Sequence, residues 1–419
     1  MSLLDLLSKD ETWAEFREYK SLHSHMSNRE FAQLDEYIAQ KRYLSITDRL
    51  NDDVRDNGVA ASDTCHGFSL PSKRVINKSG TKKKRVVYMF PEDETWVLKL
   101  LTWLLYKYDG LLSDACFSFR RQKTVKDAID KVLEIPDLED RYVLKMDIHN
   151  YFNSMPTDGM TQVIREVITD DEPLCRFLCD FLSVNRALVY SASGDEEHNH
   201  IISEERGAMA GMPVSAFMAN IYLLSLDKEF ESLGIPYFRY SDDIIVFAST
   251  EAERQKCREL VERRVAEKGL TMNPDKLALS DPGEPWEFLG FEYHNDRIDL
   301  SHVTISKMKA KIKRKCRAIY RWRIRKNVDF DHAAAVAIRV FNRKFFDIDE
   351  EYDFTWSRWF FPILTTDEGL RTLDEYLVSE LRFMYSGRHY KGNYAITYEH
   401  LKELGLRSLV HEFYDFRAK

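Results

Sequence analysis

The sequence has few cysteines, and their spacing excludes the common metal-binding and redox motifs. Its 419 residues include six cysteines, and no Cys-x-x-Cys pair occurs among them. Cys175 and Cys179 are four residues apart, which is a helical spacing, and no histidine stands near them. We therefore expect buried thiols in a reducing compartment, rather than a disulfide framework or a zinc site.

Long hydrophobic runs are also missing. The longest apolar stretch, residues 96–106, is interrupted by Lys99, and the apolar part of residues 1–16 is too short for a signal peptide. We expect a cytoplasmic protein without membrane contact. Glycine and proline are scarce as well, at 16 and 11 residues, which excludes low-complexity sequence. A chain of this length is expected to form two or three lobes.

Negative charge predominates overall, with a formal net charge of −8, but positive charge is concentrated in two segments. Residues 73–85 carry seven Lys or Arg and no acid, and residues 307–326 carry eleven and no acid. Apolar residues recur at helical intervals in and just before the second segment: Ile305, Met308, Ile312, Ile319 and Trp322. This pattern predicts a helix with one apolar stripe and a basic remainder. Because a solvated surface usually mixes both signs of charge, both segments favour contact with a polyanion backbone.

The order of the predicted elements indicates an α+β fold. Residues 1–68 have the pattern of a helical N-terminal extension. In residues 69–135, a β-hairpin is predicted around residues 78–80 and is followed by helix. Residues 136–295 alternate strands and helices, and residues 296–419 have helical patterns throughout.

Two aspartates interrupt a predicted strand. The segment FRYSDDIIVFA, residues 238–248, is rich in aromatic and β-branched residues, yet it contains Asp242 and Asp243 side by side. A solvent-facing hairpin turn would explain them. A metal site would explain them too, because carboxylates at a strand turn are hard oxygen ligands for Mg²⁺. The strand of residues 143–146 ends on Asp147, which offers a carboxylate from a second element, as two-metal nucleotidyl transfer requires.

Short blocks between residues 73 and 293 resemble, in their order, the motifs of reverse transcriptases. They are KKKRVV (82–87), CFSFRRQKT (116–124), Asp147 with Phe152, GAMAGMPVSAFMANIYLLSLD (207–227), YSDD (240–243), and GLTMNPDK (269–276) followed by EFLGF (287–291). Each block is weak evidence by itself, and their common order carries the resemblance. The resemblance includes the retron and group II intron members of the family.

The resemblance implies a right-hand polymerase that makes DNA from dNTPs on an RNA template. Residues 69–135 would form the fingers. Residues 136–295 would form a palm with an antiparallel sheet and helices, although part of residues 157–200 is also compatible with the fingers. Residues 296–419 would form an all-helical thumb and C-terminal region. Two Mg²⁺ ions, with Mn²⁺ as the alternative, are the implied cofactors.

The same resemblance assigns roles to individual residues. The metal ligands would be Asp147, Asp242 and the backbone carbonyl of Ile148, with Asp243 as a neighbouring acid. Lys276 would give a proton to the departing pyrophosphate, unless it is an ordinary solvated lysine. The residues expected to contact the nucleotide are Arg85, Arg120, Phe152, Gly211, Ser215 and Tyr240. The residues expected to contact nucleic acid are Lys82, Lys83, Lys84, Leu289, Gly290, Lys311, Arg314, Lys315 and Arg321.

Three of these residues are supported by their chemistry. Arg85 can hold a triphosphate with two parallel hydrogen bonds, which a lysine cannot do. Gly211 would allow the backbone to approach the nucleotide closely. Phe152 stands five residues after Asp147 and resembles the family's steric gate against a ribose 2′-hydroxyl, although a phenylalanine of the core would look the same.

Two positions depart from the family pattern. Ala210 precedes Gly211, and Ala216 follows Ser215, where many reverse transcriptases have Gln and Pro. These differences concern the handling of nucleotide and template. The predicted metal ligands are intact.

The C-terminal segment, residues 356–414, resembles the helical region of bacterial defence-associated reverse transcriptases. It implies that a companion structured noncoding RNA is copied into cDNA during antiphage defence, whereas an ordinary helical thumb would explain the segment equally well. Template-independent or protein-primed DNA synthesis is one alternative function. A noncatalytic RNA-binding scaffold is another, and the three intact aspartates argue against it. The sequence does not fix the oligomeric state.

Overall fold

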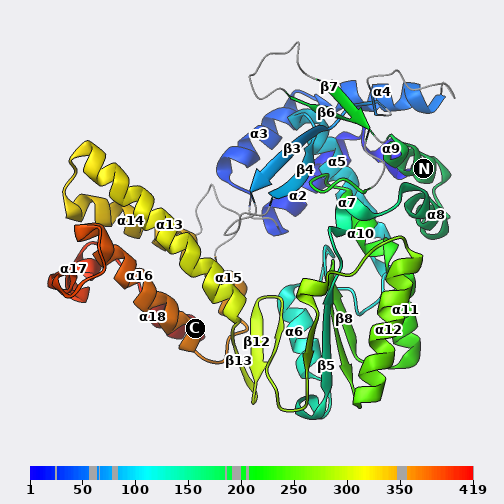
Figure 1. Cartoon of the computed structure of the whole chain (residues 1–419). Coiled ribbons are helices and arrows are strands. Elements are labelled where there is room, and N and C mark those ends of the chain that lie inside the picture. The colour runs from blue at the N-terminus through cyan, green and yellow to red at the C-terminus, as the bar shows by residue number, and fades with distance from the viewer. Residues whose placement is uncertain are drawn as a thin grey trace. The chain divides into compact units, whose positions relative to one another are not determined.

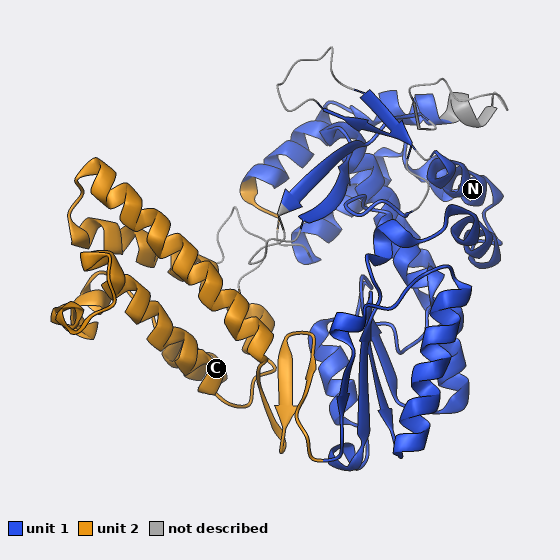
Figure 2. Cartoon of the chain, in the orientation of Figure 1, with its two compact units in different colours: residues 1–24, 29–77, 83–282 blue, residues 25–28, 78–82, 283–419 orange. Residues whose placement is uncertain are grey.

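The structure is a computed structural model that describes residues 1–23, 26–55, 64–65, 67–77, 84–184, 186–190, 200–203, 207–346 and 356–418. The chain forms two compact units (Figure 2). Unit 1 contains most of the chain up to residue 282, and unit 2 consists mainly of residues 283–419. Lys82 and Lys83 and the predicted hairpin tip at residues 78–80 lie outside the described residues.

The N-terminal half of unit 1 is mainly helical. Its described helices up to Ser183 are α1 (Leu3–Leu6), α2 (Asp10–His23), α3 (Asn28–Ala39), α4 (Tyr43–Arg55), α5 (Glu92–Leu104), α6 (Val125–Leu133), α7 (Tyr151–Ser154), α8 (Thr157–Val167) and α9 (Glu172–Ser183). Short 3₁₀ helices follow α5 and α6, at η1 (Leu105–Leu111) and η2 (Leu138–Asp140). Thr124 begins α6 with a capping box, because its side chain accepts from the Asp127 amide while the Asp127 carboxylate accepts from the Thr124 amide.

The N-terminal helices are part of the core of unit 1. Trp13 is fully buried, and its ring stacks on Tyr43 with 4.8 Å between the centroids. The hydroxyl of Tyr37 donates to the carbonyl of Asp93 at 2.9 Å, which links α3 to α5. The predicted N-terminal extension is therefore mainly helical in its described residues up to 55, and these helices pack on α5 of the segment that the sequence assigned to the fingers.

A four-stranded sheet lies beside these helices, with the order β4-β3-β6-β7 (Figure 1). Its strands are β3 (Ser72–Asn77), β4 (Lys84–Met89), β6 (Arg186–Val189) and β7 (His200–Ser203). Strands β3 and β4 pair antiparallel from Ser72 opposite Met89 to Asn77 opposite Lys84, as the predicted hairpin requires. Strand β6, which lies within residues 157–200, joins β3 in parallel and so belongs to the same sheet as β3 and β4. A short ladder connects β1 (Thr64–Cys65) and β2 (Phe68–Ser69).

The second sheet of unit 1 is antiparallel throughout, with the order β10-β5-β9-β8. Its strands are β5 (Tyr142–Asp147), β8 (Tyr237–Tyr240), β9 (Asp243–Ala248) and β10 (Ala278–Ser280). Residues 244–248 of β9 are all buried, because strand positions on both faces of this sheet are covered. The helices that follow the loop at 207–214 are α10 (Ser215–Tyr222), α11 (Leu224–Leu233) and α12 (Glu251–Glu267), and a 3₁₀ turn, η4 (Pro274–Lys276), precedes β10.

Helices α11 and α12 pack on the strands of this sheet (Figure 1). Thr250 caps α12, since its side chain accepts from the amide of Glu253, and Gly234 ends α11 in the left-handed conformation. The sheet is therefore covered by these helices, and the end of β5 lies beside the start of β9. It matches the antiparallel palm sheet that the sequence predicted.

Unit 2 begins with a three-stranded antiparallel sheet of β11 (Trp286–Phe288), β12 (Phe291–His294) and β13 (Arg297–Leu300). Asn295 and Asp296 both have positive φ, 51° and 58°, as a two-residue hairpin turn between β12 and β13 requires. The predicted boundary at residue 296 would cut this sheet. The prediction of helix from residue 296 onward is therefore wrong for β13, because the turn pairs this segment with β12 before the helices start at His302.

The remainder of unit 2 is helical in its described residues. Its helices are α13 (His302–Lys326), α14 (Phe330–Phe345), α15 (Trp356–Phe360), α16 (Glu368–Ser386), the 3₁₀ helix η5 (Lys391–Ala395), α17 (Tyr398–Glu403) and α18 (Leu409–Ala418). Ser301 caps α13, and Asn327 ends it in the left-handed conformation. The predicted apolar stripe of α13 packs on α14 and α16, with Met308, Ile312 and Ile319 buried.

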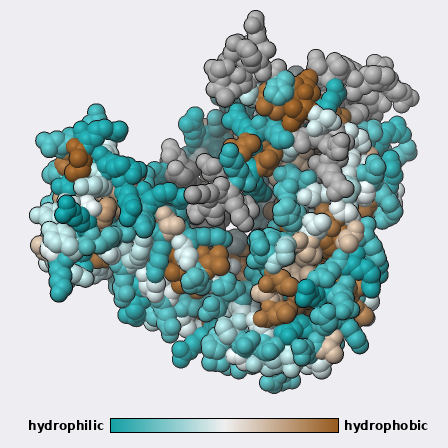
Figure 3. All heavy atoms as spheres, viewed as in Figure 1, coloured by the Kyte–Doolittle hydropathy of each residue, from teal (hydrophilic) through white to brown (hydrophobic). Residues whose placement is uncertain are grey.

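The surface is mainly hydrophilic on the face that Figure 3 shows, with hydrophobic residues in separate patches. Within the described ranges, no helix has the length and apolar character that crossing a membrane requires.

Candidate active site

Three aspartates meet where β5 ends and β9 begins. Asp147 is the last residue of β5 and lies directly opposite Asp243, the first residue of β9. Asp242 stands in the two-residue turn between β8 and β9, and its backbone carbonyl accepts from the amide of Ile148 at 3.1 Å. The structure thus brings together carboxylates that are almost a hundred residues apart in the sequence.

The turn that presents Asp242 has an unusual backbone. Ser241 has a φ of +62°, which costs free energy for a residue with a side chain and has to be held by its surroundings. The amide of Ser241 donates to Oγ of Ser118 at 2.9 Å, and its carbonyl accepts from Nη1 of Arg239 at 3.3 Å. Both ends of the Ser241 backbone are therefore fixed by buried side chains.

The guanidinium of Arg239 is itself held by a buried carboxylate. Its Nε and Nη2 donate to Asp227 at 2.7 and 2.5 Å, and neither side chain is exposed. The sequence analysis did not identify this pair, although Asp227 ends the block of residues 207–227 and Arg239 directly precedes YSDD. The available signal was an arginine and an aspartate inside otherwise apolar stretches, where a charge needs a partner.

Two lysines lie beside the aspartates. Lys276 Nζ is hydrogen-bonded to Asp147 Oδ2, and Lys145 Nζ lies 3.6 Å from Asp243 Oδ2. Strand register explains the first contact, because Ala278 pairs with Lys145 and Lys276 then falls beside Asp147. The structure places Lys276 at the site as predicted, whereas Lys145 was not predicted. A role for Lys276 as proton donor stays a prediction.

The environment raises the proton affinity of two of the carboxyl groups. Burial, followed by the negative charge of Asp147, raises the pKa of Asp242. Burial also raises the pKa of Asp243 to about 6, although Lys145 opposes the shift. Oδ1 of Asp243 is buried and has no hydrogen-bond partner. Carboxylates that are crowded and incompletely paired in this way favour a bound cation.

The residues fit a cation that completes its coordination from the substrate. In the described part of the chain, no group of three or more His, Cys, Asp or Glu side chains is arranged to hold a metal ion. Magnesium usually takes one or two protein carboxylates and completes its shell with water and substrate phosphates. Asp147 and Asp242 offer two such carboxylates, so they are the residues that could hold it.

An aromatic cluster lies next to the turn. Phe152 is half-buried on α7, and its ring lies 6.2 Å from that of Phe119 and 5.8 Å from that of Tyr151. Phe119 is 43% exposed, has a φ of +54°, and lies 6.4 Å from the ring of Tyr240. The predicted Phe152 and Tyr240 therefore both lie next to Phe119. Phe119 belongs to the block CFSFRRQKT, but no role was predicted for it.

Gly211 and Ser215 shape the loop before α10. Gly211 has a φ of +106°, and a Cβ at this position would lie 2.8 Å from the carbonyl oxygen of Tyr88. Ser215 is buried, and its hydroxyl donates to the carbonyls of Ala208 and Met209. These contacts fix the loop against β4, and contact with a nucleotide stays a prediction for both residues.

The predicted fingers residues differ in how free their side chains are. Lys84 and Arg85 are exposed on β4. Arg120, by contrast, is half-buried, and its Nη1 and Nη2 donate to the carbonyls of Ser113 and Asp109 at 2.8 Å each. Arg120 therefore stabilises its own loop. Its contact with a nucleotide stays a prediction, and the hydrogen bonds that already engage its guanidinium do not favour that contact.

Two of the predicted nucleic-acid contacts stand in the turn between β11 and β12 of unit 2. Leu289 and Gly290 have positive φ, 53° and 93°. The carbonyl of Gly290 accepts from the amide of Ser301 and from Oγ1 of Thr304, at 3.0 and 2.9 Å. The turn is thereby tied to the start of α13. Leu289 is half-exposed and remains accessible.

The basic surface of α13 includes a lysine from the next helix. Arg314, Lys315 and Arg321 are exposed, and Lys311 is half-buried. Burial, and then the positive charges of Lys344, Arg314 and Lys307, lower the pKa of Lys311. Lys344 belongs to α14 and was not predicted, because its place in this cluster depends on how α14 packs on α13.

Other cations of α13 face α16 instead. Lys309 lies over the ring of Tyr376 at 5.4 Å, and Arg317 lies over that of Phe383 at the same distance. Arg323 donates to the carbonyls of Met384 and Tyr385, at 2.8 Å each. The positive charges of the segment are therefore divided between contacts with α16 and an exposed surface.

Comparison with known proteins agrees with this geometry. The chain is 21% identical over 245 residues to the Retron Ec86 reverse transcriptase of Escherichia coli, covering 57% of this chain and 67% of that protein. It is 24% identical over 187 residues to the Retron Mx65 reverse transcriptase of Myxococcus xanthus, covering 44% of this chain and 43% of that protein. The second match thus spans less than half of the relative.

Among solved structures, apo telomerase of Candida tropicalis truncated from its C-terminal domain aligns with a TM-score of 0.46 at 12% identity, covering 63% of this chain and 60% of that one. A family model is matched over residues 76–293, more than half of the 419 residues, and this range contains the three aspartates and the whole sheet of β10, β5, β9 and β8. The chain therefore belongs to the reverse transcriptase (RNA-dependent DNA polymerase) family.

Proposed function

We propose that this chain copies an RNA template into cDNA from dNTPs at the site formed by Asp147, Asp242 and Asp243. The observation that carries the proposal is the convergence of these carboxylates at the facing ends of β5 and β9, with the pKa of Asp242 and Asp243 raised. Membership of the family supports the reaction class. In this reaction the 3′-oxygen of the primer attacks the α-phosphorus of the dNTP, and the bond to pyrophosphate breaks.

We assign the steps to residues as follows. Asp147 and Asp242 would hold the divalent cations, with the backbone carbonyl of Ile148 as a further ligand. Two Mg²⁺ ions, or Mn²⁺ in their place, would stabilise charge on the attacking and leaving oxygens when bound. Lys276, already hydrogen-bonded to Asp147, gives a proton to the departing pyrophosphate. Arg85 binds the triphosphate.

The direct test uses purified full-length protein, an RNA template annealed to a DNA primer, labelled dNTPs and Mg²⁺. We expect products that extend to the template end and are complementary to it, and we expect them to vanish when the RNA is removed by ribonuclease first. Product made without added template would favour template-independent synthesis. Product that stays attached to protein until protease treatment would favour protein priming. RNA binding without incorporation would favour a noncatalytic scaffold.

We further propose that the template in the cell is a companion structured noncoding RNA and that its copying serves antiphage defence. The resemblance of residues 356–414 to the C-terminal region of defence-associated enzymes supports this, and the exposed cations of α13 offer a surface for such an RNA. Sequencing the nucleic acid that copurifies with the chain tests the template. Phage plating on cells that express the parent or Asp242→Asn tests the role, and equal plaque counts would contradict it.

A further inference from the structure

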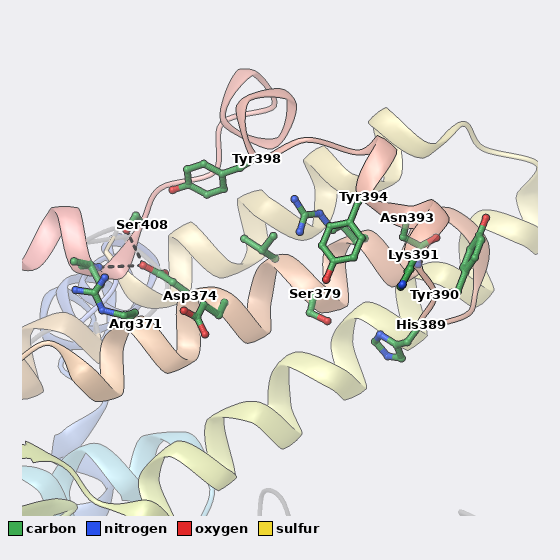
Figure 4. Close-up of a pocket in the computed structure, with 14 residues that line it drawn as sticks. Arg371, Asp374, Ser379, His389, Tyr390, Lys391, Asn393, Tyr394, Tyr398 and Ser408 are labelled. Atoms are coloured by element: carbon green, nitrogen blue, oxygen red, sulfur yellow. Dashed lines mark hydrogen bonds between the residues drawn. The ribbon is translucent and has the colours of Figure 1, made fainter.

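A cavity of about 830 Å³ opens along α16, entirely within unit 2 (Figure 4). Helix α16 forms one wall, and the segment from His389 to Tyr398 with the start of α18 forms the other. Figure 4 shows two ends, with Arg371, Asp374 and Ser408 at one and His389, Tyr390 and Lys391 toward the other. None of these residues takes part in the proposed chemistry.

Tyrosine rings stand open at the second end. The exposed fraction is 54% for Tyr390 and 67% for Tyr394, and both residues line the cavity. Aromatic rings usually bury most of their surface, since much of their contribution to stability comes from contact. Two rings left open beside one cavity indicate surfaces that a planar ligand group can cover.

The loop that carries these tyrosines is held in place. Asn393 is buried, its Oδ1 accepts from Oγ of Ser386 at 2.8 Å, and its Nδ2 donates to the carbonyl of Arg388 at 2.5 Å. The ring of Tyr390 lies over Gly392, so that a Cβ at this position would push the ring aside. The tyrosines are therefore presented by a braced loop, which reduces the ordering cost of binding.

Positive charge accompanies the rings. The guanidinium of Arg382 lies 4.9 Å from the centroid of Tyr394, and its Nε donates to the carbonyl of Ile396 at 2.8 Å. Among the described residues, Nη1 and Nη2 of Arg382 have no hydrogen-bond partner. Lys391 is exposed and belongs to the loop that Asn393 holds in place. These donors are available for an anionic group beside the rings.

Asp374, at the end of the cavity lined by Arg371 and Ser408, already accepts hydrogen bonds from the protein. Asp374 accepts from Oγ of Ser408 at 2.6 Å and from the amides of Leu409 and Val410 at 2.9 and 3.1 Å. It thereby caps α18. Arg371 at this end is paired with Asp367 at 2.8 Å. The charges that remain available for a ligand are thus those of Arg382 and Lys391, with the carboxylate of Glu375 exposed nearer the other end.

We propose that the end of the cavity formed by Arg382, Tyr390, Lys391 and Tyr394 binds unpaired nucleotides of a single-stranded nucleic acid. The bases stack on the two tyrosines, and the phosphates pair with Arg382 and Lys391. Aromatic rings next to cations are the usual means of holding single strands, because every base has a stacking face. A duplex keeps its bases stacked internally and cannot present one to Tyr394. The inference rests on the proposed function, since a template and a cDNA both have single-stranded parts.

The test is fluorescence anisotropy with the full chain and labelled 12-nucleotide single strands, one of RNA and one of DNA, at about 0.3 M salt to weaken backbone contacts elsewhere. We expect Tyr394→Ala to lower affinity by about 5- to 150-fold, since base stacking of this kind is removed. Tyr394→Phe, which keeps the ring, should stay near the parent. Tyr414→Ala removes a tyrosine of similar exposure, 55%, from α18 outside the cavity and should have no effect.

A second readout locates the contact. Photo-crosslinking with a 4-thiouridine strand should label a peptide within residues 388–398 of the parent, and Tyr394→Ala together with Tyr390→Ala should abolish this label. Parental affinity in Tyr394→Ala, or labelling only elsewhere, would overturn the inference. A duplex that competes as well as a single strand would overturn it too. Stronger binding of one of the two strands would identify the source as RNA or DNA.

Failure of this inference is distinguishable from failure of the proposed function. Asp242→Asn should bind and crosslink the single strand like the parent, because Asp242 belongs to unit 1 and not to this cavity. Tyr394→Ala should still extend a primer when the template is saturating. If Asp242→Asn polymerises normally, the proposed active site is wrong while the cavity still stands on its own binding data.

Discussion

Arg239 and Asp227 form an ion pair in which neither side chain is exposed, and the same guanidinium donates to the carbonyl of Ser241 beside the aspartate turn. Removing one partner of a buried pair leaves a charge without compensation, which typically costs about 3–5 kcal/mol. We expect Asp227→Asn to lower the free energy of unfolding by an amount in this range, measured by urea denaturation.

The matched control is an ion pair on the surface of the same unit. Glu229 and Arg264 are paired at 2.7 Å, but both side chains are partly exposed. Glu229→Gln should cost less than about 1 kcal/mol, because water screens the charges. Equal losses in the two variants would contradict the expected cost of leaving a buried charge without its partner.

The raised pKa of Asp243 predicts that the free energy of unfolding depends on pH. Its folded pKa of about 6 exceeds its ordinary value of 3.8, so the folded state binds the proton more tightly than the unfolded state does. The contribution of Asp243 to stability is therefore largest below about pH 4 and is lost as the pH rises to about 6. Without metal at pH 7, Asp243→Asn should raise the free energy of unfolding by up to about 3 kcal/mol.

Denaturant unfolding in EDTA at pH 4.5 and pH 7 measures this effect. The difference between Asp243→Asn and the parent should shrink at the lower pH, because the parent is then largely protonated. A difference that is independent of pH would mean that Asp243 has an ordinary pKa.

Phe152 predicts the choice of sugar. If its ring occupies the space of a ribose 2′-hydroxyl, Phe152→Val should raise the use of ribonucleotides relative to deoxynucleotides by about tenfold or more. The measurement is kcat/KM for a dNTP and its rNTP in both proteins. The dNTP value should change only a few-fold. Unchanged discrimination would make Phe152 a packing partner of Phe119 and nothing more.

The basic face of α13 predicts the salt dependence of nucleic-acid binding. Replacing Lys311, Arg314, Lys315 and Arg321 with Gln should weaken RNA binding. It should also lower the magnitude of the slope of log affinity against log salt by roughly 0.7–0.9 for each phosphate that the variant no longer neutralises. The free energy of unfolding should change little, because most of these side chains are exposed.

Removal of Lys256 and Arg263 from α12 provides the control for that experiment. Both are exposed on a helix that mixes acids and bases, so replacing them with Gln should leave the slope unchanged. If the α13 variant keeps the parental slope and affinity, the four residues face only solvent.

The sequence predicted the features that depend on local pattern. Asp147 and Asp242 were placed at strand ends because the apolar runs around them are short and continuous, and the stripe of α13 follows from helical spacing. It could not predict that Phe119 contacts both Phe152 and Tyr240, since that cluster joins three separate segments. Nor could it predict that Arg120 binds carbonyls of its own loop, because a motif fixes a residue type but not the direction of its guanidinium.

The same limit explains the errors in unit 2. The sequence pattern assigns β13 to a helical region because its four residues are too few to show a period, and its partner β12 is defined only by the turn at Asn295 and Asp296. Lys344 joins the basic surface through packing of α14 on α13, which spacing along one helix cannot reveal.

Asp242 and its neighbours are proposed to carry out nucleotidyl transfer, and the single-turnover rate of dNMP addition by Asp242→Asn measures this step by itself. We expect a loss of more than about a hundredfold, with RNA binding retained, because the change removes a ligand for the cation that stabilises the transferring phosphate. Asp275→Asn, which neutralises an exposed carboxylate next to Lys276, should keep the parental rate. A parental rate in Asp242→Asn would contradict the account.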